Sequence, residues 1–233
     1  MKKLICSAVA LAFTSLLAFS AQAADVAGRS SATFNDPTPH TTYSGTGTNS
    51  FTWGNAAHFG TGPNNLTFTG SRFSSAFDQP FNLGTLSYFN GTTAVGSNAT
   101  EVHFDSRLSF SQPSGLMTVN SDFVLGLNST LNNGGPAHNG DYVSFAHPES
   151  TNTFTIQGVS YKVMITGFRN VVGDGFLESN ANQFHVLEGH CAQADLYGTV
   201  VMAAVPEPET YGMMLAGLAA LGLVARRRKN KAA

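Results

Sequence analysis

Cysteine is almost absent from this chain of 233 residues, which contains only Cys6 and Cys191. Cys6 lies in an apolar N-terminal stretch that we predict to be removed, so the mature chain would keep one thiol. A single thiol excludes an intramolecular disulfide and a zinc site built on paired cysteines. Cys191 follows His190, but a lone cysteine is more often a small buried hydrophobic residue than a nucleophile.

Motifs of familiar catalytic chemistry are also lacking. The chain has no Gly-x-Ser-x-Gly turn, no His-Glu-x-x-His pair and no glycine-rich phosphate loop with a lysine. His103 and His185 fall on the polar sides of their strands, where a solvated histidine is expected. Glu101 and Asp105 would lie about 13 Å apart along a strand, beyond the usual separation of glycoside-hydrolysing carboxylates. We therefore predict a protein that is not an enzyme and has no catalytic residue and no cofactor.

Two metal alternatives are weak. His138 and His147 could meet across a loop, but zinc needs three or four converging ligands. Asp141, Asp174 and nearby Asn residues could hold calcium, yet their spacing matches no EF-hand, and turn-forming Asp and Asn explain them without an ion. We predict no metal site.

Basic residues are scarce between residues 24 and 204, where twelve Asp and Glu accompany five Lys and Arg, a formal charge of −7. The whole-chain value of −2 conceals this, because the other seven basic residues lie near the two ends. A region of this sign would not bind nucleic acid by neutralising phosphates, and anionic lipid headgroups would repel it. We predict no nucleic-acid partner.

Helix-forming Lys, Glu, Gln and Met are rare in the same region, while Thr, Ser, Asn, Gly and Phe dominate. Apolar and polar residues alternate in residues 102–110, with Ser106 as the exception, and in residues 159–165. Period two gives each strand one buried face and one wet face, and stacking two sheets buries both apolar faces. We predict an all-β fold, an antiparallel β-sandwich of the jelly-roll kind, over residues 24–204.

Turn residues separate the expected strands. Asn90-Gly91 favours a type I′ hairpin turn, in which both central residues need positive φ. Residues 132–136 predict a long surface loop, and residues 173–175 a tight turn. Residues 25–47, rich in Thr, Ser, Gly and Pro, predict a frayed lead-in or an edge strand.

The first 23 residues have the three zones of a secretory signal peptide. Met1-Lys2-Lys3 is charged, residues 4–19 are apolar, and Ala21-Gln22-Ala23 is a small-residue cleavage site. We predict a signal helix that is cut after Ala23, and therefore an exported chain.

The last 29 residues, 205–233, also have three zones. Prolines make the segment Pro206, Glu207, Pro208 extended. Residues 211–225 carry no charge and would form a helix about 22 Å long, against a hydrocarbon core of about 30 Å. Arginine stems can snorkel to make up the difference, and cations after an apolar run stay on the cytoplasmic side. These cations begin with Arg226, Arg227, Arg228 and Lys229. We predict a transmembrane anchor with its C-terminus inside.

The triplet, the apolar run and the basic end together resemble the PEP-CTERM sorting signal of Gram-negative bacteria. The resemblance implies recognition by exosortase, an integral-membrane cysteine transpeptidase that cuts near the motif. Pro206, Glu207 and Pro208 would then be the recognition triplet of a substrate, on a precursor anchored in the inner membrane. The alternative is a plain anchor that no enzyme processes.

Residues 49–54, 66–70 and 81–91 resemble the choice-of-anchor K ectodomain. That resemblance implies a β-rich surface domain paired with interchangeable anchoring tails, and it implies no reaction. It is consistent with a final location at the cell surface or outside the cell.

Three functions remain open from the sequence. The first is a structural or adhesive protein of the cell surface or of a biofilm matrix, in contact with extracellular polysaccharide. The second is a carbohydrate-binding module, in which Trp53 would offer a ring to a sugar, although a single Trp in an apolar alternation is more often a core residue. The third is a secreted hydrolase. The first is favoured because it uses the most specific motif.

Overall fold

The structure, a computed structural model, describes residues 25–40, 42–113 and 115–203, and this part of the chain is entirely β-sheet and loop. The strands, in chain order, are β1 (Asp25–Thr38), β2 (Tyr43–Ser44), β3 (Ser50–Trp53), β4 (Asn64–Gly70), β5 (Arg72–Ala76), β6 (Phe81–Phe89), β7 (Glu101–Gln112), β8 (Met117–Asn128), β9 (Asp141–Phe145), β10 (Glu149–Ile156), β11 (Val159–Gly173), β12 (Gly175–Leu177), β13 (Gln183–Val186) and β14 (Cys191–Met202). The predicted signal helix and the predicted C-terminal helix lie outside the described residues.

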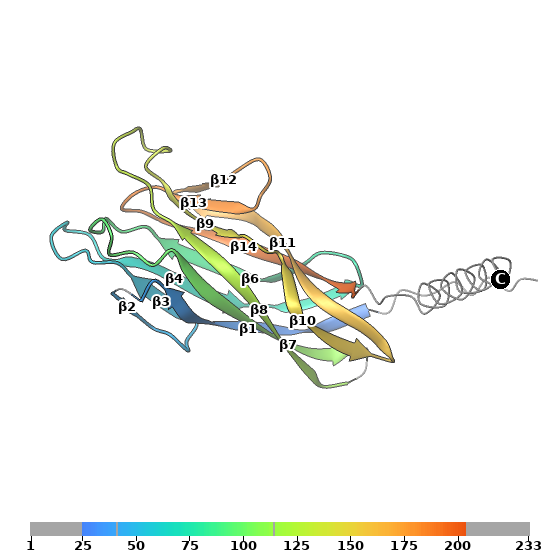
Figure 1. The fold of residues 1–233 in the computed structure, drawn as a ribbon. Helices are drawn as coiled ribbons and strands as arrows, with labels where there is room; N and C mark the ends of the chain where they lie inside the picture. The colour runs from blue at the N-terminus through green and yellow to red at the C-terminus, as the bar shows by residue number, and fades with distance from the viewer. Residues whose placement is uncertain (1–24, 41, 114, 204–233) are drawn as a thin grey trace, which may run out of the picture.

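The strands form two curled antiparallel sheets that face each other (Figure 1). Sheet A has the order β12-β13-β9-β8-β7-β1-β5, and sheet B has the order β10-β11-β14-β6-β4-β3-β2. The all-β antiparallel sandwich predicted from the sequence is confirmed, while its jelly-roll topology stays a prediction. Within the described residues, no helix is long and apolar enough to cross a membrane.

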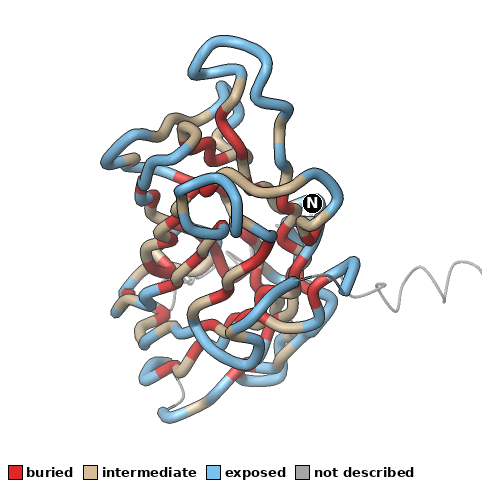
Figure 2. The backbone as a smooth tube through the Cα atoms, turned by 90° about the vertical axis from the view of Figure 1, so that its left-hand side faces the viewer, coloured by how far each residue is buried: buried red, intermediate tan, exposed pale blue. Residues whose placement is uncertain are grey.

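The core lies between the sheets, and the exposed residues lie on the loops and outer faces (Figure 2). Phe104 is at its centre, because its ring packs against the rings of Phe34, Phe68 and Phe145, with centroids 5.8, 5.0 and 5.8 Å away. The alternation that predicted β7 is confirmed, since every second residue of the strand is buried from Val102 to Phe110. Period two therefore fixes which face of the strand enters the core.

Strand β1 corrects the prediction for residues 25–47. It is neither a frayed lead-in nor an edge strand, because it pairs with β5 on one side and with β7 on the other. Gly28 lies at a register shift in the pairing of β1 with β7, and a Cβ there would lie 2.3 Å from the carbonyl oxygen of Ser109. The close approach of the two strands at this position therefore requires glycine.

The predicted hairpin turn at Asn90-Gly91 is wrong. Neither residue has positive φ, and the chain continues through an irregular segment to β7. The Asn90 side chain is buried, and its Nδ2 donates to the carbonyl oxygen of Val186 at 2.9 Å. Gly91 passes so close to Gly62 that a Cβ would meet the Gly62 carbonyl oxygen at 1.9 Å. The two other turn predictions are confirmed: residues 132–136 form an exposed loop, and residues 173–175 turn the chain from β11 into β12.

Candidate functional site

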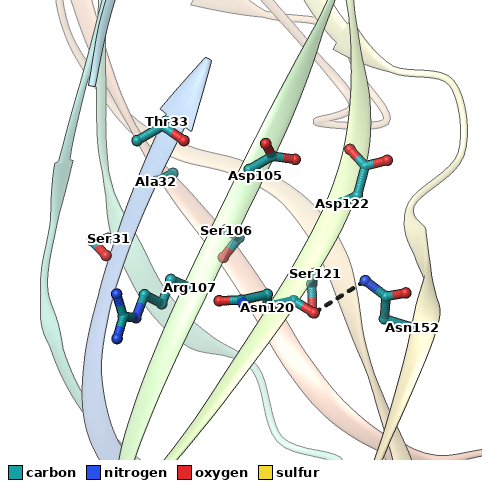
Figure 3. A pocket seen from close by; sticks show the side chains of 10 residues that line it. All are labelled: Ser31, Ala32, Thr33, Asp105, Ser106, Arg107, Asn120, Ser121, Asp122 and Asn152. Atoms are coloured by element: carbon teal, nitrogen blue, oxygen red, sulfur yellow. Dashed lines mark hydrogen bonds between the residues drawn. The ribbon is translucent and has the colours of Figure 1, made fainter. Parts of the chain in front are cut away.

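A polar groove crosses the outer face of sheet A, perpendicular to β1, β7 and β8 (Figure 3). The strand register aligns its walls: one row is Thr33, Asp105 and Asp122, and the other is Ser31, Arg107 and Asn120. Its floor is the intervening row, Ala32, Ser106 and Ser121. We call this feature the cross-strand groove. Its volume of about 510 Å³ is within the range of small-ligand sites.

One end of the cross-strand groove is closed by Asn152, which comes from β10 of sheet B. Strand β9 pairs with β8 only from Leu125 onward, so the preceding part of β8 has a free edge. Asn152 Nδ2 donates to the carbonyl oxygen of Asn120 on that edge at 3.2 Å. This contact links the two sheets, and it adds a residue of sheet B to a groove that is otherwise formed by sheet A.

The cross-strand groove holds a pair of carboxyl groups. Asp105 and Asp122 are direct partners across β7 and β8, so their side chains lie next to each other on the outer face of sheet A. His103 Nδ1 lies 2.9 Å from Asp122 Oδ1, and the Asn35 amide donates to Asp105. Burial raises the pKa of Asp105 above its usual range, and the Asp122 charge raises it further, while Asn35 and His103 act in the opposite direction. The pair is therefore electrostatically strained, because like charges directly opposite one another on a sheet are destabilising.

The predicted core position of Trp53 is the one the structure shows. Trp53 is 1 % exposed and stacks between Phe51 and Tyr88, at centroid distances of 5.4 and 5.8 Å. A ring this deeply buried is not accessible to a sugar on the described surface.

The predictions for the two strand histidines have different outcomes. His103 lies on the outer face as predicted and pairs with Asp122. The prediction of a solvated His185 is wrong, since His185 is 8 % exposed and its ring stacks between Tyr142 and Phe176, at 4.6 Å from each. The rings of the two neighbouring strands cover it, and this burial lowers its pKa despite the nearby charge of Glu178.

The remaining chemical candidates are dispersed. Cys191 is exposed, contrary to the buried position expected of a lone cysteine. Glu101 and Asp105 share the outer face of β7, but the carboxyl group adjacent to Asp105 belongs to Asp122, which the sequence reasoning missed. Over the described ranges, no three His, Cys, Asp or Glu residues lie close enough to hold a metal ion together.

Residues 204–229 match the family described as the PEP-CTERM protein-sorting motif. The match includes Pro206, Glu207 and Pro208, and it extends over the basic residues 226–229. This motif implies an exported, membrane-anchored precursor that is processed by exosortase, itself a membrane protein. No curated protein matches the chain. The resemblance to the choice-of-anchor K ectodomain stays a prediction.

Proposed function

We propose that this chain is a protein of the cell surface or extracellular matrix that exosortase sorts through its tail. Its sandwich would then serve a structural or adhesive role, without catalysis, among the extracellular polysaccharides of a biofilm. The observation that carries the proposal is the sorting-motif match over residues 204–229. The match contains the Pro-Glu-Pro triplet, the apolar run and the basic residues in the order in which the sorting signal has them.

The charge of the exported region supports a role for the tail as the attachment point. A region with a formal charge of −7 is repelled by anionic headgroups, so it has no electrostatic affinity of its own for a membrane surface. Membrane association therefore depends on the apolar residues 211–225 and the basic residues after them.

The geometry of the carboxyl pair supports binding over hydrolysis. The Asn35 amide donates to Asp105, and His103 pairs with Asp122, so both carboxyl groups lie side by side on one sheet face with partners from the protein itself. We propose that the sandwich is not an enzyme.

The sorting proposal is tested by expressing the full chain with and without an exosortase. With the enzyme, an antibody against the sandwich should detect a shortened chain released from the inner membrane. Without it, the same antibody should detect only the full-length chain in the membrane fraction. If the chain has the same length with and without the enzyme, the tail is a plain membrane anchor, and the proposal is contradicted.

A second function, binding of a neutral or basic polysaccharide, is favoured by the cross-strand groove. Arg107 and Asn120 provide hydrogen-bond donors, and Asp105 and Asp122 provide acceptors, as sugar hydroxyl groups require. The polar walls of the groove run across three strands, and Asn152 closes one end, so the end of an extended polysaccharide chain could lie in it. This alternative places the carbohydrate-binding site on sheet A and not at Trp53.

The binding proposal predicts that Arg107→Ala weakens retention in affinity electrophoresis by about 10-fold, the effect of losing a hydrogen bond from a charged donor. The matched control is Arg169→Ala, because Arg169 is also exposed but packs over the Tyr197 ring on sheet B, 4.3 Å from its centroid. That variant should bind polysaccharide as the original chain does. Equal retention of all three proteins would contradict the binding role of the groove.

The substitution Asp105→Asn distinguishes a loss of polysaccharide binding from a loss of folding stability. An amide oxygen at this position can still accept the hydrogen bond from Asn35. The substitution also removes one of two negative charges that face each other across β7 and β8. We expect the free energy of unfolding to rise by about 0.2–1 kcal/mol, the usual size of a cross-strand pair effect. Polysaccharide retention should fall at the same time, so a weaker binder that is also more stable cannot be explained by unfolding.

A further inference from the structure

A second carboxylate pair lies at the end of the sandwich, away from the cross-strand groove. Asp141 at the start of β9 and Glu188 in the turn after β13 line a pocket of about 220 Å³. Asp141 is 4 % exposed, and its Oδ1 accepts from the Thr130 amide at 2.7 Å and from the Thr130 hydroxyl at 3.2 Å. The loop before β9 therefore holds Asp141 in a fixed orientation.

Neither carboxylate has a basic partner. None of the ion pairs among the described residues involves Asp141 or Glu188. Glu188 Oε1 is buried and accepts no hydrogen bond from the described residues. An ionised carboxylate in this situation is unfavourable unless a proton or a cation neutralises it. In agreement, burial and the charge of Glu188 raise the pKa of Asp141 to about 6.

Asn90 connects the two segments that carry the carboxylates. Asn90 is 0 % exposed, and within the described structure its Oδ1 has no hydrogen-bond donor. Its Nδ2 is bonded to the carbonyl oxygen of Val186, the strand partner of Asp141, and its own carbonyl oxygen accepts from Gly189, next to Glu188. The Asn90 amide is thus fixed between the two segments that carry the carboxylates.

We propose that Asp141 and Glu188 bind a divalent cation of the calcium class, together with oxygen atoms of the residues that line the pocket beside them. Calcium takes six to eight oxygen ligands from carboxylates, amides, backbone carbonyls and water, which is the donor set of this pocket. Its further lining residues, including Asn98, Ser129 and Thr130, offer only oxygen and nitrogen atoms. Protein zinc sites usually contain histidine or cysteine ligands, and the lining of this pocket contains neither.

The ion would tie together three segments that are distant in the sequence. These are the irregular stretch after β6, the long loop between β8 and β9, and the turn between β13 and β14. The cation would therefore order this end of the sandwich once the chain reaches a calcium-containing exterior. For extracellular modules, dissociation constants of about 0.1–1 mM are usual.

The test uses the full-length chain purified in detergent at pH 7.5 and stripped with a chelator. Tyr88 lies near both carboxylates, as their charges raise its pKa after burial, and it stacks on Trp53. Terbium bound at the site should consequently give sensitised luminescence on excitation of these rings, and calcium should quench it by displacement. Calcium at 100 times its dissociation constant should raise Tm by about 5–10 °C.

Glu188→Gln keeps the size of the side chain and removes its charge, so it should weaken terbium and calcium binding at least 10-fold. Asp105→Asn, which alters the other carboxyl pair, should leave both responses unchanged, and circular dichroism should show the same β-sheet signal in every variant. The proposal is overturned if the original chain shows no saturable calcium response. It is also overturned if Glu188→Gln binds calcium normally, because the ion would then lie elsewhere.

Discussion

Replacing Glu207 with Ala should leave the full-length chain in the membrane fraction, whereas the original chain should be shortened and released. Glu207 is the charged member of the triplet Pro206, Glu207, Pro208, which lies within the matched sorting motif. From the sequence, we expect the flanking prolines to favour an extended segment, in which an enzyme could bind the Glu side chain without unfolding a helix. Loss of this side chain removes recognition while the apolar run that anchors the chain stays intact. The measurement is an immunoblot of membrane and released fractions.

Glu209→Ala is the matched control, because it removes the same charge from the same spacer two residues beyond the triplet. That variant should be processed as the original chain is. If both variants are processed normally, the triplet is not a recognition element. If both fail equally, the enzyme responds to the charge of the spacer and not to the motif.

Phe104→Ala should lower the free energy of unfolding of the sandwich by about 3–5 kcal/mol, the usual range for a buried Phe. Phe104 packs against rings from β1, β4 and β9, so truncation removes contacts on both sheets and leaves a cavity. Since domains are stable by about 5–15 kcal/mol, this single change would remove a large share of the total. Urea denaturation followed by fluorescence of Trp53, the single Trp, gives the value.

The control is Phe59→Ala, which removes the same side chain from a loop where it is 46 % exposed. Its effect should stay within about 0.5 kcal/mol, as for most surface positions. A Phe104→Ala loss below 1 kcal/mol, with an unchanged denaturant slope, would mean that the two sheets do not share the core described here.

The sequence predicts the strands whose side chains alternate strongly. In β7 large apolar residues recur at every second position, so the period alone identifies both the strand and its buried face. The position of β1 between two other strands was not predicted, because its large apolar residues are Val26 and Phe34, and small or polar residues fill most of the rest. Such a strand is held by hydrogen bonds to β5 and β7, which local composition does not reveal.

The candidate sites depend on contacts between distant residues. Asp105 and Asp122 become neighbours through the register of the β7–β8 hairpin, which pairs Glu101 with Gly126 at one end and Phe110 with Met117 at the other. The Pro113 and Gly115 turn signal, combined with the two alternating strands, could have given this register from the sequence. No comparable signal exists for Asn90, since its partner Val186 is 96 residues away.

The tail and the sandwich differ in composition, and this difference suits them to different roles. The tail has an apolar run and cations that suit a membrane, whereas the sandwich has an acidic, polar exterior. The groove and the proposed cation pocket are both lined by residues of the sandwich. Sorting and binding can therefore be changed by separate substitutions.

The central claim is that residues 205–233 are a sorting signal that is cleaved from the mature protein. Intact-mass spectrometry of the mature protein tests this claim most directly. The account predicts a chain that starts at Ala24 and ends near residues 206–208, without the apolar run 211–225. A mature protein that retains the sequence through Ala233 would contradict the account.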